Sequence, residues 1–289
     1  MLRSTMPVAS GRKSLRVHHP SSLSHRSSFP ATNSSFIVLL VLMSYVPARA
    51  QDGNRFVRWT FQDGLNLIAH KTPTMLLLGA GGAVIIAGGA QVDKDISEEV
   101  QKQFDGHEFY LSAANALGTP PAVLGPVALF GLSTAIGNRR LQDAAFTSLE
   151  AIAYAGTTTL VAKEVIGRYR PADSESAKKF DPFSGNTSTP SGHATIVFAM
   201  FTPFVYYYPH PATYALFAVG VTTDLARIAL NRHWSSDVVV GSGIGFLMAR
   251  YLSRRHLSEA AVSSAVSITP LISPNAAGVH LTLALNRPQ

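Results

Sequence analysis

Downstream of Gln51 the chain alternates long apolar stretches with short polar ones, and strict alternation of single apolar and polar residues is confined to its C-terminal part. Apolar residues at helical spacing over such lengths predict α-helices. Proline marks several of the joints between them. The predicted helices span roughly 54–70, 73–91, 93–104, 108–117, 121–137, 140–168, 192–208, 211–230 and 236–254. The pattern therefore predicts a mainly α fold, a bundle of helices.

Some of these stretches carry no charged side chain over nearly the length that a bilayer requires, notably 72–92, 109–138 and 194–223. This favours a membrane-embedded bundle. The same stretches are rich in Gly, Ala, Thr and Pro and only moderately hydrophobic. Buried helices of a soluble bundle have the same composition, so that alternative stays open.

The C-terminal segment changes character. Residues 265–272 and 278–285 each roughly alternate around a turn-like segment, which predicts a β-hairpin appended to the helices. We therefore expect a helical domain over 51–256 and a C-terminal tail over 257–289. The polar stretch 172–190 interrupts the helices, and a loop of that length in a compact bundle is typically functional or disordered.

Charge is unevenly distributed along the chain. The net charge is +7, but residues 1–50 hold six of the 24 basic residues and no carboxylate, which leaves 18 basic against 17 acidic residues in the remainder. Because the excess lies in this leader, we do not expect nucleic-acid binding.

The leader also contains an apolar run, 36–46, followed by Ala48-Arg49-Ala50, the pattern of a secretory signal cleaved after Ala50. An uncleaved anchor is the alternative. The absence of cysteine excludes disulfides and thiolate metal sites.

Three segments carry chemically capable residues: Lys163 to Pro171 (KEVIGRYRP), Pro190 to His193 (PSGH) and Arg227 to Asp237 (RIALNRHWSSD). Each alone is weak evidence. Lysine and arginine at this spacing usually belong to a solvated helix face, PSGH is an acceptable turn and helix cap, and a His–Asp pair four residues apart is often a surface pair.

Together, the order K-x6-RP, PSGH and R-x5-H-x3-D resembles the signature of the type 2 phosphatidic acid phosphatase superfamily. This superfamily includes bacterial acid phosphatases, undecaprenyl-pyrophosphate phosphatases and vanadium haloperoxidases. The motifs cover 163–237, and the helical context extends the similarity loosely over about 70–255. One departure is Ala226, where many members have serine. The resemblance implies a helical bundle of the phosphatidic acid phosphatase/haloperoxidase type and hydrolysis of a phosphate monoester or pyrophosphate.

The residue types suit that chemistry. A phosphoryl group in its transition state spreads negative charge over three oxygens and needs several fixed donors. Lys163, Arg170 and Arg227 supply positive charge, and arginine can bind two phosphate oxygens at once. Ser191 adds a hydroxyl, and Gly192 lets a backbone N–H at a helix start approach the anion. We expect these five residues to bind phosphate.

The resemblance implies that His233 attacks phosphorus to form a phosphohistidine, while His193 protonates the leaving oxygen and later activates water. Asp237, four residues after His233, is expected on the same helical face, where it accepts a hydrogen bond from the second ring nitrogen. We expect no cofactor and no metal, because the remaining histidines lack the spacing of metal ligands.

The predicted helix order brings the three motifs to one end of the bundle. The opposite end carries arginines at 139, 140, 250, 254 and 255, which the positive-inside tendency assigns to the cytoplasm. For the second group, 250 to 255, the alternative that these arginines only cap a helix C-terminus or solubilise a surface stays open. We therefore expect a bacterial inner-membrane enzyme that faces the periplasm and acts on a phosphorylated lipid or isoprenoid. The alternatives are a soluble periplasmic acid phosphatase that acts on small phosphate esters and, less favoured, a vanadium haloperoxidase.

Overall fold

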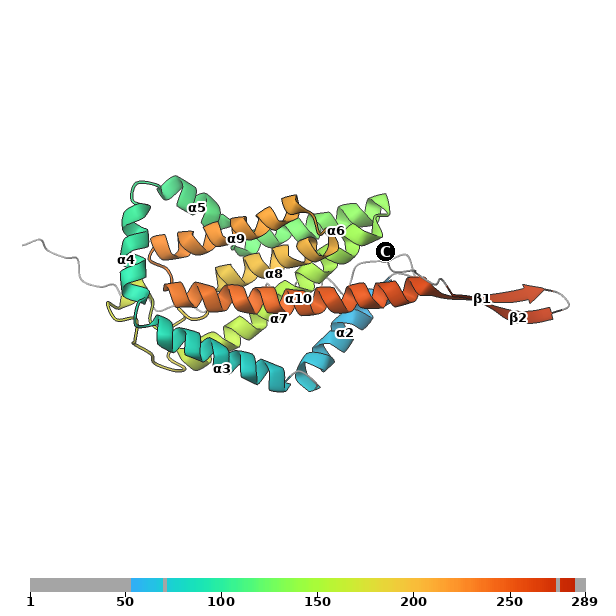
Figure 1. Cartoon of the computed structure of the whole chain (residues 1–289), viewed down its shortest axis with the longest axis horizontal. Coiled ribbons are helices and arrows are strands. Elements are labelled where there is room, and N and C mark those ends of the chain that lie inside the picture. Colours follow the sequence, from blue (N-terminus) through green and yellow to red (C-terminus); the bar gives the residue numbers. More distant parts are fainter. Residues whose placement is uncertain (1–52, 70–71, 274–275, 284–289) are drawn as a thin grey trace, which may run out of the picture.

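A computed structural model describes residues 53–69, 72–273 and 276–283. Its helices form an elongated bundle (Figure 1), and their bounds are α2 Gly53–Ala69, α3 Thr72–Gly89, α4 Asp93–Gln103, α5 Glu108–Ala116, α6 Leu124–Ile136, α7 Arg139–Ile166, α8 Gly192–Tyr207, α9 Pro211–Ala229 and α10 Ser235–Ala265, with short 3-10 helices η1 at Pro120–Val123 and η2 at Pro171–Asp173. Most predicted ends lie within a few residues of these bounds, so the mainly α prediction is confirmed. The predicted leader, with its cleavage point, lies outside the described residues.

Helices α7, α8 and α10 form the centre of the bundle, and small residues allow their close packing. The main core cluster joins aliphatic residues and alanines of these helices with Leu67 of α2: Ala151, Ile152, Ala155, Ile196, Ala199, Met200, Met248, Ala249 and Leu252. A Cβ atom added at Gly245 of α10 would lie 2.3 Å from the backbone oxygen of Thr195 on α8. Glycine at this position is therefore what lets the two helices approach so closely.

Local sequence signals end the helices where the predicted site begins. Helix α7 ends at Gly167, whose φ of 59° is left-handed, and the Gly167 N–H donates to the Lys163 carbonyl at 2.9 Å. Helix α8 begins after Ser191, whose side chain accepts from the Ala194 N–H at 3.5 Å. The ends of α7 and α9 and the beginnings of α8 and α10 meet at one end of the bundle, across which α4 lies (Figure 1).

Helix α10 extends well past the predicted end near 254, to Ala265. The chain then continues into strands β1 (Val266–Ser273) and β2 (Ala276–Leu283), which pair antiparallel with Val266 opposite Leu283. The side chains from residue 261 onward are outside the described part, so nothing describes how these strands pack. That the hairpin is a component of the folded domain therefore stays a prediction. The predicted domain limits at 50, 256 and 289 also stay predictions.

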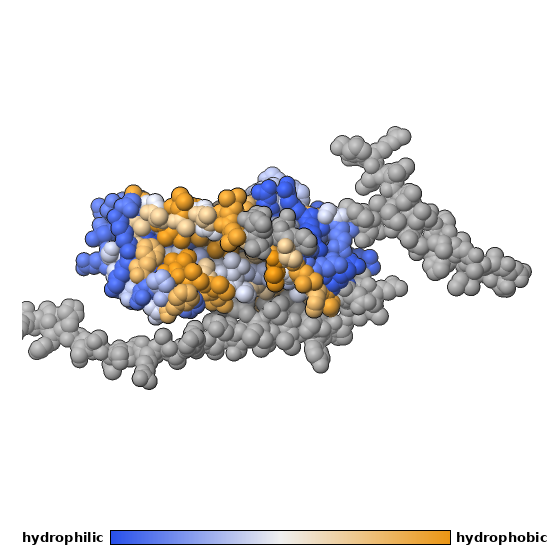
Figure 2. All heavy atoms as spheres, turned by 90° about the horizontal axis from the view of Figure 1, so that it is seen from below, coloured by the Kyte–Doolittle hydropathy of each residue, from blue (hydrophilic) through white to orange (hydrophobic). Residues whose placement is uncertain are grey.

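Hydrophobic side chains are exposed along the bundle as well as buried within it. Figure 2 shows one face on which they gather between two hydrophilic ends. On α3 the exposed residues include Leu76, Leu77, Leu78, Val84 and Ile85. Within the described residues no single helix is both long and apolar enough to cross a membrane, although the pair Met75–Gly89 and Asp93–Gln103, bent by 72°, meets that test together.

Candidate active site

Two of the cations that are predicted to bind phosphate form hydrogen bonds with the loop that follows α7. Lys163 is 9% exposed in the last turn of α7, and its Nζ donates to the Thr187 carbonyl at 2.5 Å. Arg170 precedes η2, and its guanidinium donates to the Thr187 hydroxyl at 3.1 Å. Both cations therefore contact the same residue, Thr187, of the polar stretch 172–190, which brings this stretch to the predicted site.

The PSGH segment lies directly beside this lysine. A Cβ atom added at Gly192 would lie 4.0 Å from the Lys163 Cε, so the N-terminal turn of α8 faces the ammonium-bearing side chain. The Ser191 N–H donates to the Asp237 carbonyl at 3.0 Å, which joins the second motif to the third. Ser191 is fully buried, and His193 in the first turn of α8 is partly buried.

Arg227 reaches the site from the end of α9. It is 7% exposed, and one guanidinium nitrogen donates to the Asn115 side chain of α5 at 2.6 Å. A Cβ atom added at Gly118, just after α5, would lie 2.6 Å from the His193 Cβ. The α5 segment thus contacts both Arg227 and His193, a connection for which the sequence motifs gave no signal.

The predicted arrangement of His233 and Asp237 on one helical face is wrong. His233 lies in the loop before α10, whereas Asp237 is in the first turn of that helix. The Asp237 carboxylate reaches back to the Trp234 N–H at 3.0 Å, in the manner of a capping box, and this contact fixes the start of α10. His233 Nδ1 is 3.7 Å from the Asp237 carboxylate, too long for a hydrogen bond.

Asp237 is instead bound by residues that the sequence reasoning missed. Its carboxylate accepts hydrogen bonds from the hydroxyls of Ser188 and Thr189 and pairs with the Arg168 guanidinium at 2.6 Å. Arg168 also pairs with Asp93 of α4 at 2.7 Å, and all three charged side chains are fully buried.

Arg168 connects the third motif to α4 and to the loop after α7. Asp93 in turn accepts hydrogen bonds from the side chains of Ser235 and Ser236 at the start of α10. The only sequence hint was the position of Arg168 inside the K-x6-RP segment, two residues before Arg170. Its partner Asp93 gave no hint beyond starting a predicted helix.

The three cations that are predicted to bind phosphate lie close enough for their charges to repel one another. Burial lowers the pKa of Lys163 to about 7, and the charges of Arg170 and Arg227 act in the same direction against Asp237. Burial likewise lowers the pKa of Arg227 to about 10, with further contributions from Arg170 and Arg232. Arg232 is exposed, so it adds a fourth cation at the edge of the group.

Both histidines experience these charges. Burial lowers the pKa of His193 to about 3, and the charges of Arg227, Lys163 and Arg170 contribute. Burial also lowers the pKa of His233 to about 3, although Asp237 opposes it. Both imidazoles are therefore neutral at pH 7.

The pKa of Asp237 is set by opposing effects. Burial alone would raise it, but the contacts with His233, Arg168 and Ser188 outweigh burial and hold the pKa of Asp237 well below its usual value. Asp237 therefore stays ionised, with most of its acceptor capacity committed to Arg168 and to the loop hydroxyls.

Together, the predicted residues form a buried group of cations beside two neutral imidazoles. A tetrahedral anion placed among them would relieve the repulsion between the cations and accept their hydrogen bonds. A neutral imidazole with a free ring nitrogen can act as a nucleophile or as a base. The arrangement is thus chemically capable of binding a phosphoryl group and transferring it.

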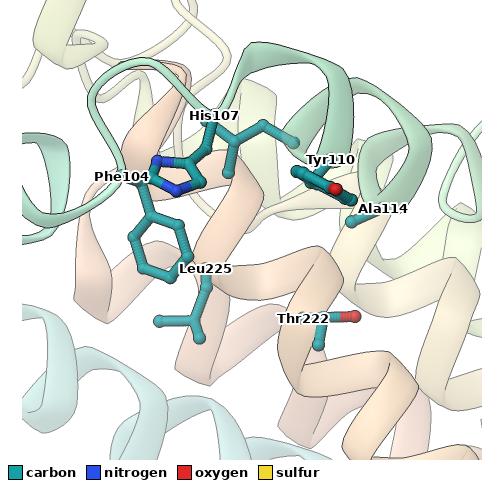
Figure 3. A pocket seen from close by; sticks show the side chains of 7 residues that line it. Phe104, His107, Tyr110, Ala114, Thr222 and Leu225 are labelled. Atoms are coloured by element: carbon teal, nitrogen blue, oxygen red, sulfur yellow. The ribbon is translucent and has the colours of Figure 1, made fainter.

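An apolar pocket of about 250 Å³ lies between α4, α5 and α9 (Figure 3). None of the predicted site residues lines it; its lining consists of Phe104, His107, Tyr110, Leu111, Ala114, Thr222 and Leu225. In sequence, Ala114 directly precedes Asn115, the partner of Arg227, and Leu225 lies two residues before Arg227. The pocket therefore shares two helices with the site.

Comparison with known proteins shows that this chain is similar to phosphatases. Residues 144–259 match the PAP2 superfamily, which confirms the resemblance seen in the motifs. Lipid A 1-phosphatases of Rhizobium johnstonii and Rhizobium etli are each 32% identical to the chain over 99 residues, a match that covers 32% of this chain and 40% and 42% of theirs. The chain thus spans about two fifths of the length of these relatives.

A solved structure shares the fold. The crystal structure of a transmembrane PAP2 type phosphatidylglycerolphosphate phosphatase from Bacillus subtilis matches with a TM-score of 0.51 at 18% sequence identity. The match covers 63% of this chain and 96% of that chain. The helical bundle described above is therefore of the PAP2 type.

Proposed function

We propose that this chain, whose residues 144–259 match the PAP2 superfamily, is a phosphoric ester hydrolase that removes phosphate from a phosphorylated lipid through a phosphohistidine. The observation that carries the proposal is the convergence of Lys163, Arg170 and Arg227 near two neutral imidazoles. Burial lowers the pKa of all three cations, and the charges of Arg170 and Arg227 lower the pKa of Lys163 further, so this arrangement favours the binding of an anion. The named activity of the phosphatase relatives agrees with this chemistry.

In the first step, the free ring nitrogen of His233 attacks phosphorus and the bond from phosphorus to the ester oxygen breaks. Its Nδ1 lies on the side of Asp237, so Nε2 is the attacking atom. His193 gives its proton to the leaving oxygen. Bound phosphate partly neutralises the three cations that lower the pKa of His193, so the substrate itself promotes protonation of this acid.

In the second step, His193 accepts a proton from water as the water oxygen attacks phosphorus. The bond from phosphorus to His233 breaks, inorganic phosphate leaves, and His233 becomes neutral again. His193 is left with a proton, as it was when the substrate was bound, and releases it to solvent when phosphate leaves. Lys163, Arg170, Arg227 and the N-terminal turn of α8 at Gly192 bind the phosphoryl oxygens throughout. Asp237, held by Arg168, stabilises the positive charge that His233 acquires.

Two surface features support a lipid as the carrier of the phosphate. The exposed hydrophobic residues of α3 belong to the face on which apolar side chains gather (Figure 2), a surface suited to contact with lipid. The apolar pocket beside α9 shares helices with the site and is smaller than the 300–1,000 Å³ typical of pockets for drug-sized ligands, so it suits a segment of a hydrocarbon chain.

The distribution of arginines in the bundle suggests where in the cell the reaction takes place. The enzyme acts at the bacterial inner membrane with its site on the periplasmic side, as the arginines at the opposite end of the bundle favour. Fractionation with and without detergent tests this: recovery of the chain in the soluble fraction without detergent contradicts membrane association and supports the soluble phosphatase.

The mechanism is tested by trapping the intermediate with labelled p-nitrophenyl phosphate. The p-nitrophenolate leaving group needs little protonation, so His193→Ala still forms the phosphohistidine but hydrolyses it slowly and accumulates label. His233→Ala forms no labelled enzyme, and turnover falls to background. With phosphatidic acid, whose leaving group needs an acid, His193→Ala lowers turnover by about 10²–10⁴-fold.

His210→Gln, which removes an exposed imidazole at the opposite end of the bundle, is the matched control and retains activity. Label or turnover that survives in His233→Ala overturns the mechanism. Equal turnover of phosphatidic acid in micelles and of the soluble ester leaves the mechanism in place but contradicts the preference for lipid.

A further inference from the structure

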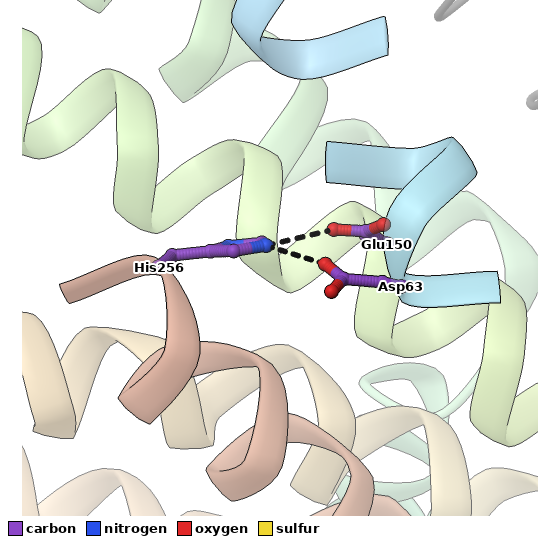
Figure 4. A group of neighbouring side chains, drawn as sticks. All are labelled: Asp63, Glu150 and His256. Atoms are coloured by element: carbon purple, nitrogen blue, oxygen red, sulfur yellow. Dashed lines mark hydrogen bonds and ion pairs between the residues drawn. The ribbon is translucent and has the colours of Figure 1, made fainter. Parts of the chain in front are cut away.

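A second buried group of ionisable side chains lies far from the phosphate site. Asp63 of α2, Glu150 of α7 and His256 of α10 are buried and point toward one another (Figure 4). We call them the Asp63–Glu150–His256 cluster. His256 follows Asp237 on the same helix at a separation of about 28 Å, taking ~1.5 Å of rise per residue. The proposed phosphatase reaction therefore makes no use of this cluster.

The ligand-type atoms of the cluster lie at the distances that one ion requires. His256 Nε2 is 2.8 Å from an Asp63 carboxylate oxygen and 3.5 Å from a Glu150 carboxylate oxygen, and one atom from each residue lies within 4.8 Å of the others. Ligands bound to a central ion at about 2.0–2.2 Å are separated by comparable distances. A small shift of the side chains would place all three around one ion.

Glu150 is the member of the cluster that forms no hydrogen bond, although it lies 3.5 Å from His256 Nε2. It is 1% exposed, and neither of its carboxylate oxygens accepts a hydrogen bond. Asp63 differs, because its other oxygen forms an ion pair with the Arg255 guanidinium at 2.6 Å. A buried carboxylate without a hydrogen bond is costly, and its orientation toward His256 indicates the place where a cation would compensate it.

The surroundings of His256 are those of a metal-binding imidazole. The Thr147 hydroxyl donates to the Asp143 carbonyl at 2.7 Å, so at 2.8 Å it accepts from the Nδ1–H of His256. This leaves Nε2 facing the two carboxylates. The Trp59 ring stacks on the imidazole at 3.9 Å and holds its plane. A second nitrogen fixed by a hydrogen bond and a ligating carboxylate held by its own partner are the usual support of a metal site.

We propose that the Asp63–Glu150–His256 cluster binds one divalent transition-metal ion of the Zn²⁺ type, which links α2 to α7 and α10 in the folded bundle. One imidazole and two carboxylates suit such an ion better than Ca²⁺ or Mg²⁺, which prefer a larger set of oxygen ligands. Water takes the fourth position. The role is structural, because the phosphate site lies at the other end of α10.

The test uses the full chain, stripped of metal by a chelator and titrated with CoCl₂ and then with ZnCl₂. We expect one Co²⁺ per chain, with the visible absorption of a four-coordinate ion, displacement by Zn²⁺, and a higher Tm with either metal. Glu150→Gln and His256→Gln lose this binding. Thr147→Val, which keeps all three ligands, weakens it by about 10–100-fold.

His210→Gln is the matched control and binds metal as the wild type does, because it removes an exposed imidazole outside the cluster. Absence of stoichiometric Co²⁺ and Zn²⁺ binding to the wild-type chain overturns the proposal, because the cluster is then only a set of buried ion pairs. This result does not depend on whether the variants fold. Binding that survives in Glu150→Gln and His256→Gln overturns it as well, because the ion is then held elsewhere.

Discussion

Replacement of Arg168 by methionine tests the network that supports the proposed nucleophile. Arg168 is fully buried and pairs with two fully buried carboxylates, Asp237 at 2.6 Å and Asp93 at 2.7 Å. Arg168→Met keeps much of the side-chain volume but leaves both carboxylates without this partner. Breaking a buried ion pair in this way typically costs about 3–5 kcal/mol. That is a large share of the roughly 5–15 kcal/mol that stabilises a typical protein.

The assay is thermal unfolding of wild type and variants at pH 7. A loss of this size lowers Tm by roughly 6–20 °C, taking ~2–4 °C per kcal/mol for a domain of this size. Asp93→Asn removes one of the two orphaned charges, so the double variant Arg168→Met/Asp93→Asn should lose less than the sum of the single variants, by about 0.5–3 kcal/mol.

Lys178→Met is the matched control, because Lys178 is an exposed lysine of the same loop region, and its effect should stay within about 0.5 kcal/mol. Two results would refute the reasoning: a cost for Arg168→Met as small as that of Lys178→Met, or simple additivity with Asp93→Asn. Either would mean that the guanidinium does not compensate the two carboxylates.

The remaining predictions concern pH and helix packing. In the proposed mechanism the ammonium form of Lys163 binds phosphate, and burial lowers the pKa of Lys163 to about 7. The value of kcat/KM should therefore fall as pH rises through about 7, and Lys163→Arg should move that decline to higher pH. An unchanged decline in a pH profile argues against this role. Stability should change with pH in the opposite sense. Between pH 7 and 10.5 the unfolded chain, in which Lys163 has its ordinary pKa of 10.5, binds more protons than the folded chain. Lys163 should therefore make Tm rise with pH in that window, and Lys163→Met should remove this effect. Gly245→Ala should lower the free energy of unfolding by about 1–3 kcal/mol through overpacking against α8, as measured by thermal unfolding. Gly243→Ala on the same helix should raise the free energy of unfolding by up to ~1 kcal/mol, because an added Cβ atom there has no neighbour within 4 Å. Equal effects of the two substitutions would contradict the close approach of α8 and α10.

The sequence by itself determined the helices to a large extent, and it named residues that the fold brings to one end of the bundle (Figure 1). Apolar periodicity, proline joints and a cap such as Ser191 act between residues close in the chain, so they can be detected locally. The three motifs lie at the ends of consecutive helices, and the order of those helices suffices to bring the motifs to one end of the bundle.

Only the tertiary structure decided which buried charges pair and how His233 is held. Arg168 meets Asp93 and Asp237 from 75 and 69 positions away, and His256 meets Asp63 across 193. A single arginine or aspartate has no local pattern that selects one distant partner over another, since any opposite charge satisfies it equally in the unfolded chain. The packing of α2, α4, α7 and α10 makes that selection, because burial removes water as the competing partner and leaves only the groups that the folded backbone brings within reach.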